Sequence, residues 1–68
     1  MNIAVNGTGE LTTAKTIAEF LLSKGFERDS FKGLIVEHNL NIVKTDKWDS
    51  VLLNDGDNLE IIKLMGGG

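Results

Sequence analysis

The end of the chain carries the residues whose type and spacing could do chemistry. Gly66, Gly67 and Gly68 follow directly on 58–65, a run with the β-branched and aliphatic content of a strand. Glycine has no Cβ, so three in a row can extend over about 10 Å through a slot too narrow for other side chains. This favours chemistry at a terminal carboxyl group. A loose end or linker has the same composition, so the tail alone leaves both interpretations open.

Other candidates for chemistry lack partners in the sequence. His38 is the single histidine and has no signature of a nucleophile or metal partner, so we interpret it as a surface residue of a strand. Asp55 and Asp57 flank Gly56, but they lack the ligand series of a Ca²⁺ loop, and we interpret them as turn residues. Without a catalytic pair, metal cluster or cofactor motif, we expect a chain that is not an enzyme and binds no cofactor itself.

Composition limits the class of protein further. Sixty-eight residues make one small domain, and the absence of cysteine excludes disulfides and fits a reducing cytosol. Ten acidic against seven basic residues give a net charge of −3, which disfavours nucleic acid and favours a cationic protein face as partner. Residues 1–6 form no leader, and no window approaches the roughly 20 apolar residues of a membrane span. We expect a cytoplasmic protein that contacts no membrane and is a monomer when free.

The N-terminal part predicts a hairpin. Residues 1–5 alternate between apolar and polar, the period of a strand with one buried face. Residues 6–9, Asn-Gly-Thr-Gly, supply turn chemistry, and 10–13 would be a short polar return strand at the edge of a sheet.

The next segment predicts the one long helix. Thr16 stands three residues before Glu19, the spacing of a capping box at the start of a helix over 17–24. Gly25 then occupies the position of a left-handed C-cap, with apolar Phe26 just beyond it.

The second half predicts short strands joined by turns. We expect a polar linker anchored by Phe31 at 27–32, a strand at 33–38, a turn at 39–41, a short strand at 42–43, a helical turn with Trp48 packed inward at 45–49, a turn at 54–57 and a last strand from 58. These elements predict an α+β fold of the β-grasp type, a mixed sheet of four to five strands packed on one main helix, with the last strand beside the first. The domain would span 1–65, with 66–68 as a flexible tail.

The last strand also predicts a surface patch. If Leu59 and Ile61 face the helix, alternation turns Ile62 and Leu64 to the opposite face, where no second helix is available. Ile62 and Leu64 would then form a partner patch, to which Met65 could belong. The alternative is that a neighbouring strand or loop covers them.

Taken in order, these motifs resemble the ThiS family, small sulfur carriers of thiamine biosynthesis in the ubiquitin-like β-grasp superfamily. The resemblance rests on Val5-Asn6-Gly7 after the first strand, on 16–22 opening the helix, on the 55–57 turn and on the terminal glycines. It covers essentially the whole length of the chain. No single motif is specific, but their order in so short a chain is.

The resemblance implies a cycle centred on Gly68. Its carboxylate would be adenylated by a partner similar to ubiquitin-activating enzymes, which uses ATP and Mg²⁺. The adenylate would become a thiocarboxylate with sulfur from a cysteine desulfurase or another donor, and thiazole synthase would receive the sulfur. Gly67 and Gly66 would be recognised in the partner's channel, although the family pattern needs only two glycines and leaves the role of Gly66 open.

The sequence leaves two alternative functions open. The small subunit of molybdopterin synthase uses the same tail chemistry for another product. A noncovalent β-grasp interaction module would instead function through its sheet face, with incidental glycines.

Overall fold

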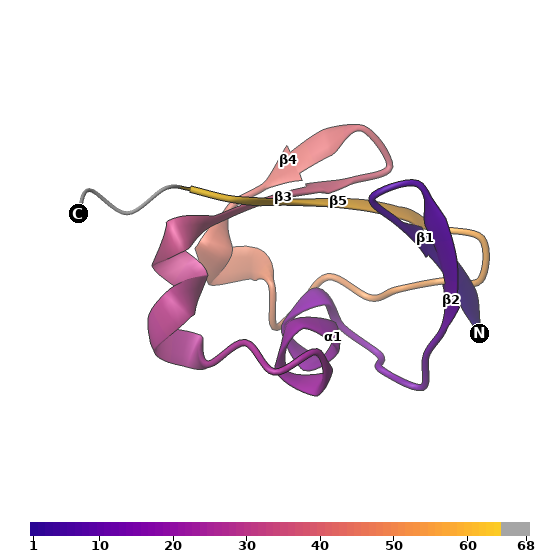
Figure 1. Ribbon diagram of the computed structural model, residues 1–68, viewed down its shortest axis with the longest axis horizontal. Helices are drawn as coiled ribbons and strands as arrows, with labels where there is room; N and C mark the ends of the chain where they lie inside the picture. The colour runs from indigo at the N-terminus through magenta and orange to yellow at the C-terminus, as the bar shows by residue number, and fades with distance from the viewer. Residues whose placement is uncertain (65–68) are drawn as a thin grey trace.

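The computed structural model describes residues 1–64 as a two-layer α+β domain, in which one five-stranded mixed sheet is covered on one face by a helix (Figure 1). The elements are β1 (Asn2–Val5), β2 (Thr8–Leu11), α1 (Ile17–Ser23), β3 (Leu34–His38), β4 (Asn41–Val43) and β5 (Asn58–Lys63). The strand order is β2-β1-β5-β3-β4. The predicted α+β, β-grasp architecture is confirmed. The predicted tail, with the boundary between 65 and 66, lies outside the described residues.

β5 is the central strand that organises the sheet. It runs parallel to β1, where Val5 pairs with Leu59, and antiparallel to β3 along five residue pairs that end with Leu34 and Lys63. A parallel pair needs a crossover connection, and the segment containing α1 supplies it. The chain's last strand therefore lies inside the sheet beside its first strand, as predicted.

The first hairpin is tighter than the sequence predicted. Asn6 (φ 50°) and Gly7 (φ 84°) form a two-residue turn with both residues at positive φ, the turn type whose twist matches that of the flanking strands. β2 consequently begins at Thr8 and ends at Leu11, so the prediction of a four-residue turn and a return strand at 10–13 was wrong by two residues.

Helix α1 has the predicted C-cap and one of the two hydrogen bonds of the predicted capping box. The Glu19 N–H donates to Thr16 Oγ1 at 3.1 Å, although the Glu19 carboxylate reaches back to the Lys15 N–H rather than to that of Thr16. At the other end Gly25 has φ 95°, and the Phe26 N–H donates to the Leu21 carbonyl at 3.1 Å. This left-handed C-cap ends the helix and turns the chain toward the sheet's end.

Two 3₁₀ helices close the remaining side of the core. The first, Arg28–Gly33, occupies the stretch predicted as a polar linker, so that prediction was wrong about its conformation, while Phe31 is buried as expected. The second, Thr45–Lys47, precedes Trp48, whose ring centroid lies 5.2 Å from that of Phe31. The Trp48 indole N–H donates to the Val43 carbonyl at 2.8 Å, which satisfies its only polar group.

The hydrophobic core lies between the sheet and α1. Its largest fully buried side chains are those of Trp48, Phe20, Ile17, Leu21, Leu59 and Val36. Within residues 1–64 no helix is long and apolar enough to cross a membrane.

Candidate functional site

The described structure shows how the segment leading to the predicted reactive end is held. β5 ends at Lys63, and the next residue still pairs with the sheet because the Leu64 N–H donates to the Gly33 carbonyl at 2.8 Å. The four predicted residues that follow, Met65, Gly66, Gly67 and Gly68, lie outside the described residues. Their assigned roles therefore stay predictions, and the structure supplies the base from which the tail starts.

Asn6 holds the opposite edge of β5 and was missed as a functional candidate. Its side-chain Oδ1 accepts from the Ile61 N–H at 2.7 Å, and its Nδ2 donates to the Ile61 carbonyl at 3.3 Å. The Asn6 side-chain amide thus bonds to β5 in the way that a peptide unit of β1 would if β1 continued past its turn. Sequence reasoning recognised Asn6 as a turn residue, but nothing in the sequence points to a partner 55 positions later.

The face of the sheet opposite α1, the outer sheet face, carries exposed aliphatic side chains. Ile62 is 45% exposed and Leu64 48%, so the alternative in which neighbouring elements cover them does not hold. Ile62 pairs with Ile35 across β3, which places both side chains on this face, and Ile42 on β4 is exposed by 70%. Whether a partner contacts Ile62 and Leu64 stays a prediction.

Two carboxylates lie within the outer sheet face. Glu37 pairs directly with Glu60 on β5, and its other cross-strand partner is Ile42 on β4. Like charges directly opposite on neighbouring strands repel one another. Neither carboxylate forms an ion pair with any of residues 1–64. The face is therefore apolar with an acidic centre, which suits a partner surface of positive charge.

His38 and Asp57 form a network that the sequence did not reveal. The His38 ring Nε2 lies 2.7 Å from Asp57 Oδ2, which also accepts from the Asn54 N–H at 2.8 Å, while Asn39 Nδ2 donates to Asp57 Oδ1 at 3.1 Å. Burial alone would raise the pKa of Asp57, but the hydrogen bonds from His38, Asn54 and Asn39 outweigh it and hold the pKa below its usual value.

This network is structural. It ties the 54–57 turn, with Gly56 at φ 89°, to the β3–β4 turn, in agreement with the interpretation of Asp57 as a turn residue. His38 is half-buried rather than a free surface residue, so that part of its interpretation was wrong. Within the described part of the chain, no group of three or more His, Asp or Glu side chains could hold a metal ion.

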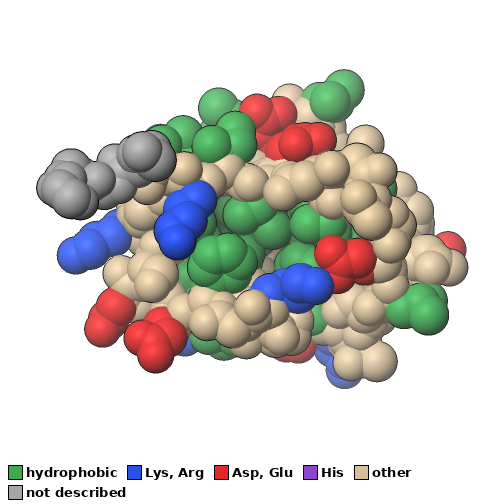
Figure 2. Space-filling view, viewed as in Figure 1, with side chains coloured by type: hydrophobic (Ala, Val, Ile, Leu, Met, Phe, Trp, Pro, Cys, Tyr) green, Lys and Arg blue, Asp and Glu red, His purple; other side chains and the backbone are tan. Residues whose placement is uncertain are grey.

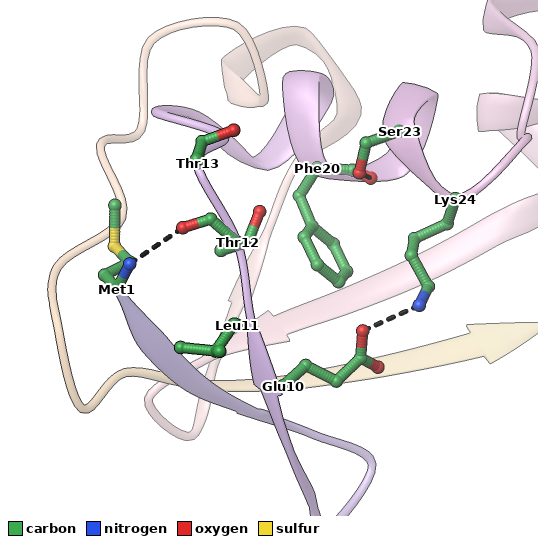
Figure 3. Close-up of a pocket in the computed structure, with 8 residues that line it drawn as sticks. All are labelled: Met1, Glu10, Leu11, Thr12, Thr13, Phe20, Ser23 and Lys24. Atoms are coloured by element: carbon green, nitrogen blue, oxygen red, sulfur yellow. Dashed lines mark hydrogen bonds and ion pairs between the residues drawn. The ribbon is translucent and has the colours of Figure 1, made fainter.

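A shallow pocket of about 580 Å³ between β2 and α1 offers no catalytic arrangement (Figure 3). Its charged groups are already paired. The Met1 amino group donates to the Thr12 carbonyl at 2.8 Å, and Lys24 Nζ lies 2.6 Å from Glu10 Oε1. Figure 3 shows Lys24 and Glu10 pointing toward one another beside the Phe20 ring, so this ion pair joins the helix to the edge strand.

Comparisons with known proteins agree on the kind of protein that this chain resembles. The ThiS family matches residues 2–68. A protein named thiazole synthase, from Paramagnetospirillum magneticum (strain ATCC 700264 / AMB-1), is 40% identical over 68 residues, which is all of this chain but 20% of that protein. The chain thus spans about a fifth of the length of the curated relative it matches.

Solved structures give the same result. The crystal structure of a thiamine biosynthesis protein (ThiS) from Geobacter metallireducens superposes with a TM-score of 0.81 at 27% identity, covering 100% of both chains. An NMR solution structure of a thiamine biosynthesis protein from Geobacter metallireducens gives 0.77 at 28% identity, covering 100% of this chain and 88% of the other. The ubiquitin-like β-grasp fold predicted from the sequence matches these structures.

Proposed function

The chain belongs to the ThiS family, the sulfur carriers of thiamine biosynthesis, and we propose that it carries sulfur on the carboxyl group of Gly68. The observation that carries this proposal is the family match, which extends over residues 2–68 and so includes the terminal glycines. The described structure supports it with a last strand anchored on both edges, by Gly33 and by Asn6, just before those glycines. Because the members of this family are small carrier proteins, we propose that this chain is a substrate of partner enzymes and not itself an enzyme.

The chemistry requires activation because a carboxylate is a poor electrophile. The Gly68 carboxylate attacks the α-phosphorus of ATP and displaces pyrophosphate, which leaves an acyl adenylate with AMP as leaving group. A sulfur nucleophile then attacks the carbonyl carbon and expels AMP. Sulfide gives the thiocarboxylate directly, whereas a persulfide gives an acyl disulfide, whose S–S bond a second thiol must reduce, releasing the thiocarboxylate and forming a disulfide with the donor. ATP and Mg²⁺ belong to the adenylating partner, which is similar to ubiquitin-activating enzymes. Gly66 and Gly67 let the tail lie extended in that partner's channel.

Two partners follow from this role. A segment 40% identical to this whole chain lies within a longer protein named thiazole synthase, which supports thiazole synthase as the acceptor of the sulfur. A cysteine desulfurase or another donor supplies it. The outer sheet face, with Ile62 and Leu64 exposed beside the base of the tail, is the surface that we assign to partner docking. The expected cytoplasmic location stays a prediction.

The competing function is a noncovalent β-grasp module that functions through the outer sheet face alone. The test is ATP-dependent release of pyrophosphate by the adenylating partner, measured with the intact chain and with a chain lacking Gly68. A carrier supports release only with Gly68 present, whereas both chains still bind the partner. Binding without pyrophosphate release from either chain would instead favour the noncovalent module.

A further inference from the structure

The end of β5 has an unused edge. In its ladder with β3, the Leu64 N–H donates to the Gly33 carbonyl and the Asn39 N–H donates to the Asn58 carbonyl. Along an antiparallel ladder, the backbone N–H and C=O groups of successive residues point alternately to the two edges of a strand. The backbone groups of Ile61 and Lys63 therefore point away from β3, to the other edge of β5. Asn6 takes those of Ile61. The N–H and C=O of Lys63 point the same way and bond to none of residues 1–64.

An apolar hollow of about 530 Å³ lies beside this free edge. Its apolar lining comes from Val5, Phe20, Phe26 and Ile61, of which Phe26 and Ile61 are only partly buried. Figure 2 shows hydrophobic side chains lying in a hollow of this face, with basic side chains on two sides of it. Phe26 and Ile61 are therefore partly exposed to solvent at the place where β1 turns away from β5 and the pairing stops, while Val5 and Phe20 beneath them are buried.

The charges around the hollow select the kind of ligand. Lys24 is already paired with Glu10 at 2.6 Å. Lys63 lines the hollow as well, since its side chain shares the inner face with Ile61, and it forms no ion pair with any described residue. An anionic group would thus find one unpaired ammonium here, next to an apolar surface that accepts a hydrocarbon side chain.

From this geometry we propose that an extended segment of the adenylating partner adds as a strand to the free edge of β5 at Lys63. Its backbone bonds to the N–H and C=O of Lys63, in the mode in which main-chain bonds give affinity and pockets beside the strand give specificity. Side chains two positions apart in a strand share a face, so the segment places an apolar residue in the hollow and an acidic residue beside the Lys63 ammonium. This inference rests on the proposed function, because it names the same partner.

Amide hydrogen exchange on the wild-type chain tests the inference directly. The ¹⁵N-labelled chain is measured alone and in complex with the adenylating partner. We expect the Lys63 amide to exchange at least about tenfold more slowly in the complex. The Leu64 amide serves as internal control, since it is already bonded to Gly33 and should change much less.

Two substitutions at one position separate the backbone from the charge. Lys63→Gln keeps the N–H and removes the ammonium, whereas Lys63→Pro removes both, and proline is tolerated at an edge whose N–H is unbonded. We expect Lys63→Gln to weaken binding a few-fold and Lys63→Pro by about tenfold more. Both variants should retain the circular dichroism of the wild type.

The outcomes distinguish this inference from the function on which it rests. Unchanged Lys63 exchange in a complex that releases pyrophosphate would overturn the inference and leave the carrier function intact. Equal affinities of folded Lys63→Pro and Lys63→Gln would do the same. If the wild-type chain forms no complex and supports no pyrophosphate release, the proposed function fails and the inference fails with it.

Discussion

Replacement of Asn6 tests how the base of the tail is held. The side chain makes two hydrogen bonds to Ile61, of 2.7 and 3.3 Å, at an exposed position. Such bonds contribute about 0.5–1 kcal/mol each at an exposed position, so the loss of both should cost about 1–2 kcal/mol of unfolding free energy. Asn6 also has φ 50°, where alanine is strained by about 1 kcal/mol relative to glycine. We therefore expect Asn6→Ala to cost about 2–3 kcal/mol and Asn6→Gly about 1–2.

The loss expected for Asn6→Ala is a large share of the domain's total free energy of unfolding. A domain of 68 residues is expected to have roughly 3–10 kcal/mol of stability, so Asn6→Ala should lower the urea midpoint markedly. The order of stability, wild type above Asn6→Gly above Asn6→Ala, separates the bonds from the backbone strain. Exchange of the Ile61 amide should also accelerate in Asn6→Gly, whereas the Asn39 amide, bonded to the Asn58 carbonyl, should be affected only through global stability.

Two results would contradict this role of Asn6. One is that both variants lie within about 0.5 kcal/mol of the wild type, since the bonds would then contribute nothing measurable. The other is an unchanged exchange rate for the Ile61 amide in Asn6→Gly, which would show that Asn6 does not hold β5.

Three further predictions concern the tail, the outer sheet face and the buried acid. Gly67→Val should block thiocarboxylate formation without moving the urea midpoint of unfolding. The control Gly9→Ala, where an added Cβ meets open space, should change neither thiocarboxylate formation nor the urea midpoint. Full thiocarboxylate formation by Gly67→Val would contradict a narrow channel in the partner. Ile62→Asp should weaken binding to the adenylating partner by about tenfold or more, whereas Leu52→Asp, at a more exposed position outside the five strands, should not. Equal effects of the two substitutions in a binding titration would remove the outer sheet face from the docking surface. Asp57→Asn should cost about 1–3 kcal/mol at neutral pH by urea unfolding. The folded state holds the pKa of Asp57 below its unfolded value, so the stabilisation by Asp57 is present above about pH 4 and is lost as the pH falls through the folded pKa. Asp57→Asn should therefore lose less stability in acid than the wild type. Parallel profiles of stability against pH for the two proteins would contradict this prediction.

The sequence predicted the fold where local and global signals agree. The N-cap at Thr16, the C-cap at Gly25 and the alternation around Ile61 each depend on neighbours close in the chain, and each is confirmed by the structure. Of the predicted capping box, only the bond from the Glu19 N–H to Thr16 Oγ1 forms. The hairpin turn was misjudged by two residues because Asn-Gly-Thr-Gly contains more turn-forming residues than a two-residue turn uses. The 3₁₀ helix at Arg28–Gly33 was missed because its residues are polar apart from Phe31 and show no helical period.

The site was less accessible to sequence reasoning. Asn6 bonding to Ile61, and His38 bonding to Asp57, join residues 55 and 19 positions apart, and the pairing depends on strand register rather than on any local pattern. The unused edge at Lys63 likewise follows only once the hydrogen-bond alternation with β3 is known. By contrast, the exposure of Ile62 and Leu64 follows from alternation along one strand, and so the sequence could propose it.

The intact mass of the chain tests the central claim most directly. The protein is incubated with ATP, Mg²⁺, the adenylating partner and a sulfur source, alongside a chain lacking Gly68. The carrier account predicts a mass gain equal to the replacement of one oxygen by sulfur, in the intact chain alone. An unchanged mass, with a partner that is active in its own ATP-dependent reaction, would contradict it.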